Sequence, residues 1–488
     1  MYNSKLRAPV ALTFDDVLLE PAESHLEPDE ADTKTRFSRR IALQIPLVSA
    51  AMDTVTEAAT AIALARDGGI GVIHRNMTAE REAEEVTKVK QAEELIERKV
   101  MSVGPLATVQ EVERLMTDHH IGGVPVIEEG KIVGIVSRRD VRAIAAHRGR
   151  ETIEAIMTRK PITADESITM DKALEIMYTS KVERLPVVDT EGRLVGIITM
   201  QDILEKRQYP KATRDPGGNL RVAAAVGPFD FERAVMLDEI GTDALVVDCA
   251  HGHNMKVVKS VREIKGSVKA DVVAGNIATS KAAEELVDAV DGLKVGIGPG
   301  SICTTRIVAG VGVPQITAIA RVADISEPAG VPVIADGGVR YSGDVAKAIA
   351  AGADSVMIGS LFAGTDEAPG RVITIKGRRY KQYRGMGSLG AMSGGESSDR
   401  YFQRKEIGKT KFVPEGVEGV TPYVGRISDV IYQLVGGLKS GMGYTGSKTL
   451  EDMHKKTKFI QITTAGYSES HPHNILITDE APNYRLTE

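Results

Sequence analysis

A cysteine in a glycine-rich segment is the residue of this chain best suited to covalent chemistry. Cys303 lies in the segment GIGPGSICTTR at positions 296–306. Three glycines and a proline exclude a regular helix or strand, so the segment is predicted to be a loop. A substrate can reach a thiol in a loop, and the thiolate is the reactive form. Cys303 is therefore predicted to be a nucleophile, with an inert loop thiol as the alternative.

The other cysteine fits a different role. Cys249 ends the apolar run ALVVDC and is predicted to be a packed core residue. Two cysteines in 488 residues make neither a disulfide framework nor a zinc site built mainly of thiolates.

Two later glycine clusters are typical of phosphate binding. They are ADGGV at 335–339 and MIGSLFAG at 357–364, and each ends an apolar run. Glycine lets backbone N–H groups approach a phosphate, and barrel enzymes often bind phosphate after strands seven and eight. Asp336 is predicted to accept hydrogen bonds from ribose hydroxyls. The predicted phosphate contacts are Gly337, Gly338, Gly359 and Ser360. Each cluster alone could be a tight turn.

A long polar segment follows these clusters. Residues 376–420 are rich in glycine and have few apolar anchors. So long a stretch is uncommon in a compact domain unless it is functional or disordered. We predict a mobile flap over the site. The alternative is an unstructured insertion.

Eight short apolar runs, separated by helical stretches, predict the scaffold that positions these residues. Continuous apolar runs alternating with helices indicate parallel strands covered by helices. Eight such units predict an α/β fold of the (β/α)₈ (TIM) barrel type. An open doubly wound sheet is the alternative, although no G-x-G-x-x-G motif follows an early strand. The runs are 45–53, 69–76, 221–227, 244–252, 271–276, 292–300, 331–338 and 354–360.

An internal repeat interrupts the barrel pattern. The segment 121–141 recurs at 182–203, and the pair resembles tandem CBS modules, a Bateman domain that commonly binds adenine nucleotides. The boundaries predicted from this are 1–94 for the first part of the barrel, 95–206 for the inserted domain, and 207–488 for the second part. By the resemblance, four residues would contact a nucleotide: Ser137, Asp140, Thr199 and Asp202. Simple helix N-caps at Ser137 and Thr199 are the alternative.

The charged run at 78–99 is predicted to be one solvated helix. Its buried side would carry Ala83, Val86, Val89 and Ile96.

Composition predicts a cytoplasmic globular protein. Apolar residues make up 42% of the chain, and the formal net charge is −6. No run approaches the roughly 20 apolar residues that span a bilayer, and no overall positive charge favours nucleic acid. We therefore expect neither a membrane nor a nucleic-acid partner.

The motifs GPGSICTTR, ADGGV, MIGSLFAG, YRGMGS and SSDRYFQ together resemble the IMP dehydrogenase family. The resemblance implies that Cys303 adds to C2 of the hypoxanthine ring of inosine 5′-monophosphate (IMP) and that NAD accepts the hydride. Water would then hydrolyse the covalent thioimidate. In the family a flap Arg-Tyr pair activates that water, which assigns the role to Arg400 and Tyr401, with Thr305 as an accessory.

Further site residues follow from the resemblance alone. Residues holding IMP would be Ser301, Asp336, Gly337, Gly338, Gly359, Ser360, Tyr383, Gly385, Met386, Gly387 and Glu415. Residues on the NAD side would be Asp248, Asn276, Gly296 and Gly298.

The resemblance also implies a potassium ion held by backbone carbonyls of the cysteine loop. Those carbonyls would belong to Gly298, Gly300 and Cys303. A neighbouring subunit would complete the site with Glu469, Ser470 and His471. A homotetramer is the expected assembly, with an octamer also open.

Two alternatives stay open at this point. Guanosine monophosphate reductase shares the barrel and the cysteine loop, but it lacks the hydrolytic flap pair. A non-catalytic adenine-nucleotide sensor would use the repeat and keep the barrel only as a scaffold. Separately from these alternatives, adenine or guanine nucleotides at the repeat are expected to tune activity or assembly.

Overall fold

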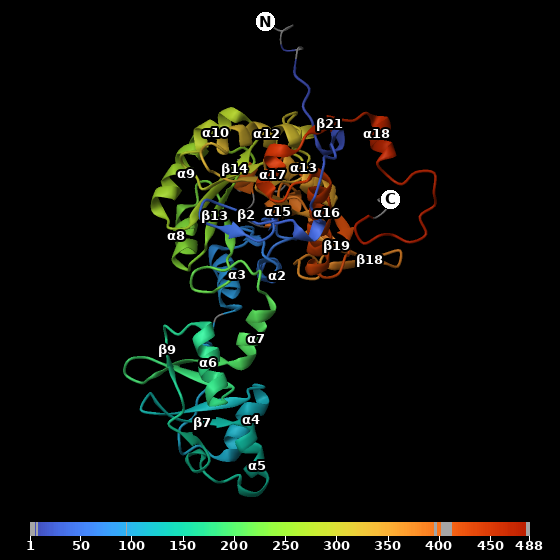
Figure 1. The fold of residues 1–488 in the computed structure, drawn as a ribbon. Helices are drawn as coiled ribbons and strands as arrows, with labels where there is room; N and C mark the ends of the chain where they lie inside the picture. Colours follow the sequence, from blue (N-terminus) through green and yellow to red (C-terminus); the bar gives the residue numbers. More distant parts are fainter. Residues whose placement is uncertain (1–4, 6–7, 94, 395–397, 402–411, 485–488) are drawn as a thin grey trace. The chain divides into compact units, whose positions relative to one another are not determined.

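A computed structural model describes Lys5 and residues 8–93, 95–394, 398–401 and 412–484 (Figure 1). The chain separates into two compact units. Met1–Ala92 and Lys211–Glu488 form the first, and Glu93–Pro210 form the second. The first unit is therefore interrupted in sequence by the second.

A closed parallel barrel forms the centre of the first unit. Each of the eight predicted runs corresponds to one strand, and β17 pairs with β4 through Val356 and Leu47, which closes the sheet. The predicted barrel is confirmed, and the alternative of an open sheet is wrong. The strands in barrel order are β12 (Ala223–Val226), β13 (Ala244–Asp248), β14 (Asp271–Ile277), β15 (Gly292–Val295), β16 (Val333–Asp336), β17 (Ser355–Ile358), β4 (Leu47–Ser49) and β5 (Ile70–Ile73).

Alternation along the strands divides the core into two layers. In β12, Ala223 and Ala225 belong to the inner cluster, whereas Ala224 and Val226 pack outward. The outward residues contact covering helices, and the inward ones fill the barrel. The helices around the barrel are α2 (Ala58–Arg66), α3 (Ala79–Gln91), α8 (Phe231–Glu239), α9 (Met255–Ser267), α10 (Ser280–Leu286), α12 (Gln315–Ser326), α13 (Ser342–Ala350) and α16 (Ile427–Thr445).

The predicted helix at 78–99 is wrong in its length. Helix α3 ends at Gln91, and Ile96 belongs to the core of the second unit. The helix ends in a turn at Ala92, and Glu97 forms an isolated bridge with Ile197 of β11 (Leu194–Thr199) in the second unit.

The described part of segment 376–420 is not one continuous loop. Strand β19 (Arg378–Arg384) pairs on either side with β18 (Val372–Ile375) and β20 (Glu418–Pro422). Between β19 and β20 lie α15 (Leu389–Gly394) and the 3₁₀ turn η4 (Ser398–Tyr401). Residues 395–397 and 402–411 of the expected flap lie outside the described residues. The mobility of the segment stays a prediction.

Short elements complete the first unit. Strand β1 (Val17–Leu19) pairs with β21 (Phe459–Gln461), and β2 (Thr35–Arg36) pairs with β3 (Ala42–Leu43). The remaining helices are α11 (Thr305–Val308), α14 (Ser360–Ala363), α17 (Leu450–Lys456) and α18 (Thr464–Glu469), with 3₁₀ turns η1 (Phe14–Asp16) and η2 (Pro28–Glu30).

The second unit contains two copies of one motif. Each copy has a helix, a two-stranded hairpin and a second helix, and the repeated segments 121–141 and 182–203 cover the hairpin and the start of the second helix. The first copy contains α4 (Val109–Asp118), β6 (Gly123–Glu128), β7 (Lys131–Ser137) and α5 (Arg138–Arg148). The second copy contains α6 (Met170–Ser180), β10 (Arg184–Val188), β11 and α7 (Met200–Gln208). Between them lie η3 (Ile153–Ala155), β8 (Thr158–Arg159) and β9 (Ala164–Asp165).

Part of the segment that precedes each copy pairs with the other copy. Glu97, upstream of the first copy, pairs with β11 of the second copy, and β8, upstream of the second copy, pairs with β7 of the first. Two aligned glycines make room for this crossing. A Cβ on Gly134 would collide with Met157, and one on Gly196 would collide with Ile96. Neither copy therefore completes its sheet alone.

Among the described residues, none of the helices combines the length and the apolar character needed to cross a membrane.

The crossing predicts a specific loss of stability on changing Gly196 to alanine. The new Cβ would lie 2.7 Å from the carbonyl oxygen of Glu97, and the backbone there is fixed by strand pairing. We expect Gly196→Ala to destabilise the second unit by about 1–3 kcal/mol. Calorimetric unfolding would measure the change. Gly104→Ala is the control, because a Cβ added there would have no other atom within 4 Å. Equal unfolding curves for the two variants would contradict the account.

Candidate active site

A cavity at the carboxyl ends of the barrel strands gathers most of the predicted site residues. Its empty volume is about 880 Å³, including its opening to solvent. The predicted residues that line it are Asp248, Asn276, Gly296, Gly298, Gly300, Cys303, Thr305, Asp336, Gly337, Gly359, Tyr383, Gly385, Met386, Arg400, Tyr401 and Glu415.

A second cavity of about 810 Å³ adjoins the first, since Gly337, Gly359 and Tyr383 line both. It adds the predicted residues Ser301, Gly338 and Ser360. Backbone geometry explains the glycines, because Gly337 and Gly338 have φ angles of +90° and +87°, which other residues rarely adopt. The two cavities together form one site with a glycine-lined end.

Cys303 lies between β15 and the short helix α11, at the boundary of the first cavity. Its Sγ donates a hydrogen bond to Thr305 Oγ1 at 3.2 Å. Segment 415–417 holds the loop from the other side. The amide of Thr304 donates to the Glu415 carbonyl at 2.9 Å, and the amide of Val417 donates to the Ile302 carbonyl at 3.0 Å. The thiol is thus partly exposed on a loop fixed by backbone hydrogen bonds.

Arg400 and Tyr401 reach the same cavity from η4. Arg400 forms an ion pair with Asp248, and its carbonyl accepts a hydrogen bond from the Ala250 amide at 3.1 Å. Burial lowers the pKa of the Arg400 guanidinium, although its interaction with Tyr401 acts in the opposite direction. Burial also raises the pKa of the Tyr401 hydroxyl. Gly387 lies against Tyr401, since a Cβ there would lie 2.7 Å from Tyr401 Cζ.

A buried lysine at the centre of the site was missed by the sequence analysis. Lys294 in β15 is 2% exposed. Its Nζ lies 3.0 Å from Asp248 Oδ1 and 2.8 Å from Asp336 Oδ2, and it also donates to Asn276 Oδ1. Lysines are almost never fully buried unless they are paired. A lone lysine inside the apolar run GLKVG was the available signal.

Tyr383 is a second buried phenol of the site. Burial raises its pKa to about 12, and a hydrogen bond with Ser301 opposes the shift. The hydroxyl therefore stays protonated at neutral pH and can donate to a ligand.

Comparison with known proteins matches this site to one family. The model of the IMP dehydrogenase / GMP reductase domain matches residues 11–473. The chain belongs to the IMP dehydrogenase / GMP reductase family. The resemblance found in the sequence motifs is thereby confirmed.

Relatives of this family cover the chain nearly end to end. An inosine-5′-monophosphate dehydrogenase of Halobacterium salinarum is 55% identical over 99% of this chain and 97% of its own length. One of Methanocaldococcus jannaschii is also 55% identical, over 100% of both chains. A crystal structure of a GMP reductase variant from Trypanosoma brucei in complex with guanosine 5′-monophosphate has a TM-score of 0.86 at 40% identity, over 97% of this chain and 100% of its own.

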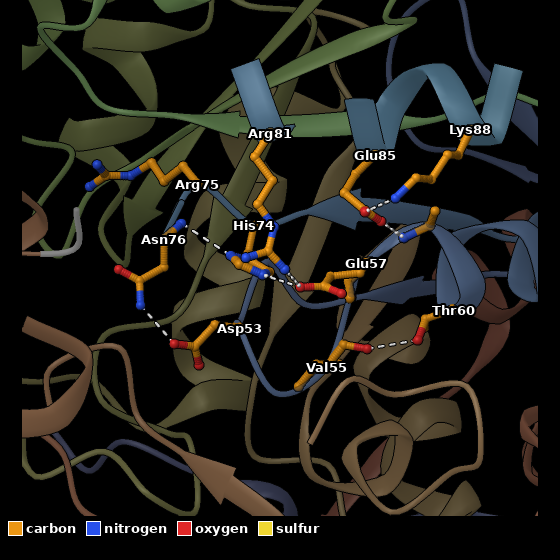
Figure 2. Close-up of polar contacts among 12 residues, drawn as sticks. Asp53, Val55, Glu57, Thr60, His74, Arg75, Asn76, Arg81, Glu85 and Lys88 are labelled. Carbon is orange, nitrogen blue, oxygen red and sulfur yellow. Dashed lines mark hydrogen bonds and ion pairs between the residues drawn. The ribbon is translucent and has the colours of Figure 1, made fainter. Parts of the chain in front are cut away.

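Polar contacts join the loops after β4 and β5 to the strand before the predicted nucleotide loop, and Figure 2 shows the contacts within those two loops. Asn76 donates to Asp53 at 2.7 Å, and Asp53 forms a bidentate ion pair with Arg384. Arg384 directly precedes Gly385 and Met386. In the same view His74 lies 3.5 Å from Glu57, and a hydrogen bond with this histidine lowers the pKa of the Glu57 carboxyl. The network ties the loops after β4 and β5 to the end of β19.

The predicted potassium ligands are not brought together within this one chain. Gly298 and Gly300 line the first cavity, whereas Glu469, Ser470 and His471 line neither cavity. His471 lies instead 3.0 Å from the Tyr484 hydroxyl. These three residues were expected from a neighbouring subunit, so the prediction stays open. No group of three His, Cys, Asp or Glu side chains that could hold a metal occurs within the part of the chain that the structure describes.

The repeat residues form helix caps in the second unit. Ser137 Oγ accepts from the Asp140 amide, and Thr199 Oγ1 accepts from the Asp202 amide. In turn, the carboxylates of Asp140 and Asp202 accept hydrogen bonds from the backbone amides of Ser137 and Thr199, at 2.9 and 3.0 Å. The capping alternative therefore describes these contacts, and nucleotide binding there stays a prediction. Cys249 is fully buried, as expected for a packed residue.

Proposed function

We propose that this protein is an IMP dehydrogenase, which oxidises inosine 5′-monophosphate to xanthosine 5′-monophosphate with NAD. The observation that carries the proposal is that Cys303, Arg400 and Tyr401 line one cavity. A reductase would need the cysteine but no pair able to activate water. The names of the relatives at 55% identity support the same choice.

In the proposed reaction Cys303 is the nucleophile. Its thiolate adds to C2 of the purine, the C2–H bond breaks, and hydride passes to NAD, which is thereby reduced. Water then adds to C2 of the thioimidate, and the C–S bond breaks to release product and thiol. One IMP, one NAD⁺ and one water give one xanthosine 5′-monophosphate, one NADH and one proton.

The IMP site proposed here follows the two cavities. Gly337, Gly338, Gly359 and Ser360 would bind the phosphate through the second cavity, because glycine leaves backbone N–H groups accessible. Asp336, at the end of β16, would accept from the ribose hydroxyls. The remaining contacts to the nucleotide are assigned to Ser301, Tyr383, Gly385, Met386, Gly387 and Glu415.

The NAD side is assigned to Asp248, Asn276, Gly296 and Gly298. Asp248 pairs with Arg400 in this structure, so the flap residue and a dinucleotide ribose would compete for one carboxylate. Arg400 and Tyr401 would therefore enter after NADH leaves and activate the water. Thr305, which accepts from the Cys303 thiol, would assist. Burial lowers the pKa of Arg400, which is the direction that a guanidine acting as a base requires.

Two variants separate the two halves of the reaction. Cys303→Ala removes the nucleophile, so NADH formation from IMP and NAD is expected to fall by at least about 10³-fold. Arg400→Ala keeps the thiol, so a first-turnover burst of NADH is expected, followed by steady turnover reduced about 10²–10⁴-fold. Stopped-flow absorbance of NADH measures both phases.

Three outcomes would count against the proposal. Unchanged turnover in Cys303→Ala would show that Cys303 is not the nucleophile. Loss of the burst in Arg400→Ala would show that Arg400 is needed at or before hydride transfer. Oxidation of NADPH with guanosine monophosphate, without NADH formation from IMP, would make the protein a reductase. Thermal unfolding of each variant controls for damage to the fold.

We further propose that potassium binds at the cysteine loop of a homotetramer or octamer. The offered ligands are neutral backbone carbonyls of Gly298, Gly300 and Cys303, a donor set that suits this large monovalent cation. Because one loop supplies only part of a shell, Glu469, Ser470 and His471 of a second copy would complete it. Replacing potassium with choline is expected to lower turnover at least about tenfold, or about 1.4 kcal/mol in the barrier. Equal turnover in both salts, or a monomer in light scattering, would reject this assignment.

We also propose that the second unit is a tandem CBS domain whose adenine or guanine nucleotide ligands tune activity or assembly. The repeated Ser/Thr-x-x-Asp turns at Ser137 and Thr199 support it. Calorimetric titration with ATP, GTP and AMP is expected to show binding, and Asp140→Ala with Asp202→Ala is expected to weaken it. The absence of heat for all three nucleotides at millimolar concentration would end this proposal.

A further inference from the structure

Lys294 is saturated by protein acceptors in this structure. Its ammonium group has three N–H donors, and three side-chain oxygens accept from it, one each on Asp248, Asn276 and Asp336. The lysine side chain is 2% exposed. A group with no remaining donor is poorly suited to bind a substrate directly. Its contacts fit a residue that acts through its neighbours.

The neighbours of Lys294 belong to both halves of the site. Asp336 ends β16 and lies at the IMP side, and Asp248 ends β13 and lies at the NAD side. The second oxygen of Asp248 contacts Arg400. Arg400, Asp248, Lys294 and Asp336 thus form a row of alternating charge across the cavity.

We propose that Lys294 is a positioning residue whose charge lets Asp248 release Arg400 and accept NAD in turn. This rests on the proposed function, which requires Asp248 to serve the flap and the dinucleotide at different steps. A buried carboxylate that loses its only cation is costly. With Lys294 present, Asp248 keeps one cationic partner when Arg400 leaves.

Formal charges give the direction of the effect. The two acids and two bases of the row are balanced while Arg400 is paired, and one negative charge is in excess when it withdraws. Without Lys294, that excess would be one charge larger in each state. Arg400 would then be held more strongly, and the anionic dinucleotide would enter a more negative site. The affinity for NAD should therefore fall more than the rate of hydrolysis.

Asp336 and Asn276 add a second, smaller consequence. Asn276 donates to Asp336 at 2.9 Å and to the Gly296 carbonyl at 2.7 Å, so Asp336 keeps one partner when the lysine is removed. Asp248 depends more on Lys294, because its other partner is the departing Arg400. The KM for IMP is thus expected to rise less than the KM for NAD.

The protein contains a matched control lysine. Lys90 Nζ also lies between two carboxylates, 2.8 Å from Asp215 and 2.9 Å from Asp243, and its side chain is 14% exposed. Asp243 directly precedes β13, so this cluster lies at the opposite end of the barrel strands from Cys303. Lys90→Met removes a lysine of the same kind without touching the site.

The test compares Lys294→Met, Lys294→Arg and Lys90→Met in the intact protein. Lys294→Met is expected to raise the KM for NAD at least about tenfold and to raise that for IMP less. Lys294→Arg is expected to restore the KM for NAD to within about threefold of wild type, because the charge returns. Lys90→Met should leave both KM values unchanged. Thermal unfolding of each variant reports any purely structural loss.

A double-mutant cycle adds a readout that a structural role would not move. If Lys294 acts through Asp248, Asp248→Asn already removes the effect, so Asp248→Asn with Lys294→Met should be no worse toward NAD than Asp248→Asn alone. Additive losses would overturn the proposal. If Lys294→Met does not fold, Lys294→Gln removes the charge with a polar side chain and is judged by the same criteria.

The possible failures can be told apart. If the wild-type protein forms no NADH from IMP, both the proposed function and this inference are contradicted. Active wild type, with equal KM values for NAD in Lys294→Met and Lys90→Met, would overturn only the role of Lys294.

Discussion

Closure of the parallel barrel is the constraint on which the site depends. Pairing of β17 with β4 and of β5 with β12 joins strands from both sides of the inserted unit into one ring. Parallel strands in a closed ring present all their carboxyl ends at one rim. Asp248, Asn276 and Asp336, which lie at the ends of three strands, therefore face one cavity with the cysteine loop.

The alternation of side chains along β15 determines where the charge of Lys294 lies. Leu293 and Val295 pack outward with the helices, so Lys294 between them points into the barrel. There it meets the carboxylates of Asp248 and Asp336. Removing one partner of such a buried ion pair typically lowers the free energy of unfolding by about 3–5 kcal/mol. The geometry that places the cysteine loop thus also fixes these buried charges.

The sequence predicted the parts of the structure that follow from local patterns. Eight apolar runs predicted eight barrel strands, and the glycines of the ADGGV segment predicted a close approach that positive φ angles at Gly337 and Gly338 now explain. Contacts between distant segments were harder. Nothing near Lys294 in sequence indicates its partners, which come from three other strands. The end of α3 was also wrong, because pairing of Glu97 with a distant strand outweighs the helical pattern.

The position of the insertion limits how the second unit can influence chemistry through the chain itself. Residues 93–210 leave the barrel after α3 and return before β12, which is the end of the strands away from Cys303. Any strain passed along the backbone must therefore travel the length of α3 or β12 to reach the rim that carries Cys303. Helix α3 is held by a buried ion pair on this route. Its Glu82 pairs with Arg233 at 2.8 Å, and Arg233 also holds the carbonyls of Arg75 and Met77 in the loop after β5. Because Arg233 connects α3 to that loop, a small rotation of the helix would move the loop at the rim.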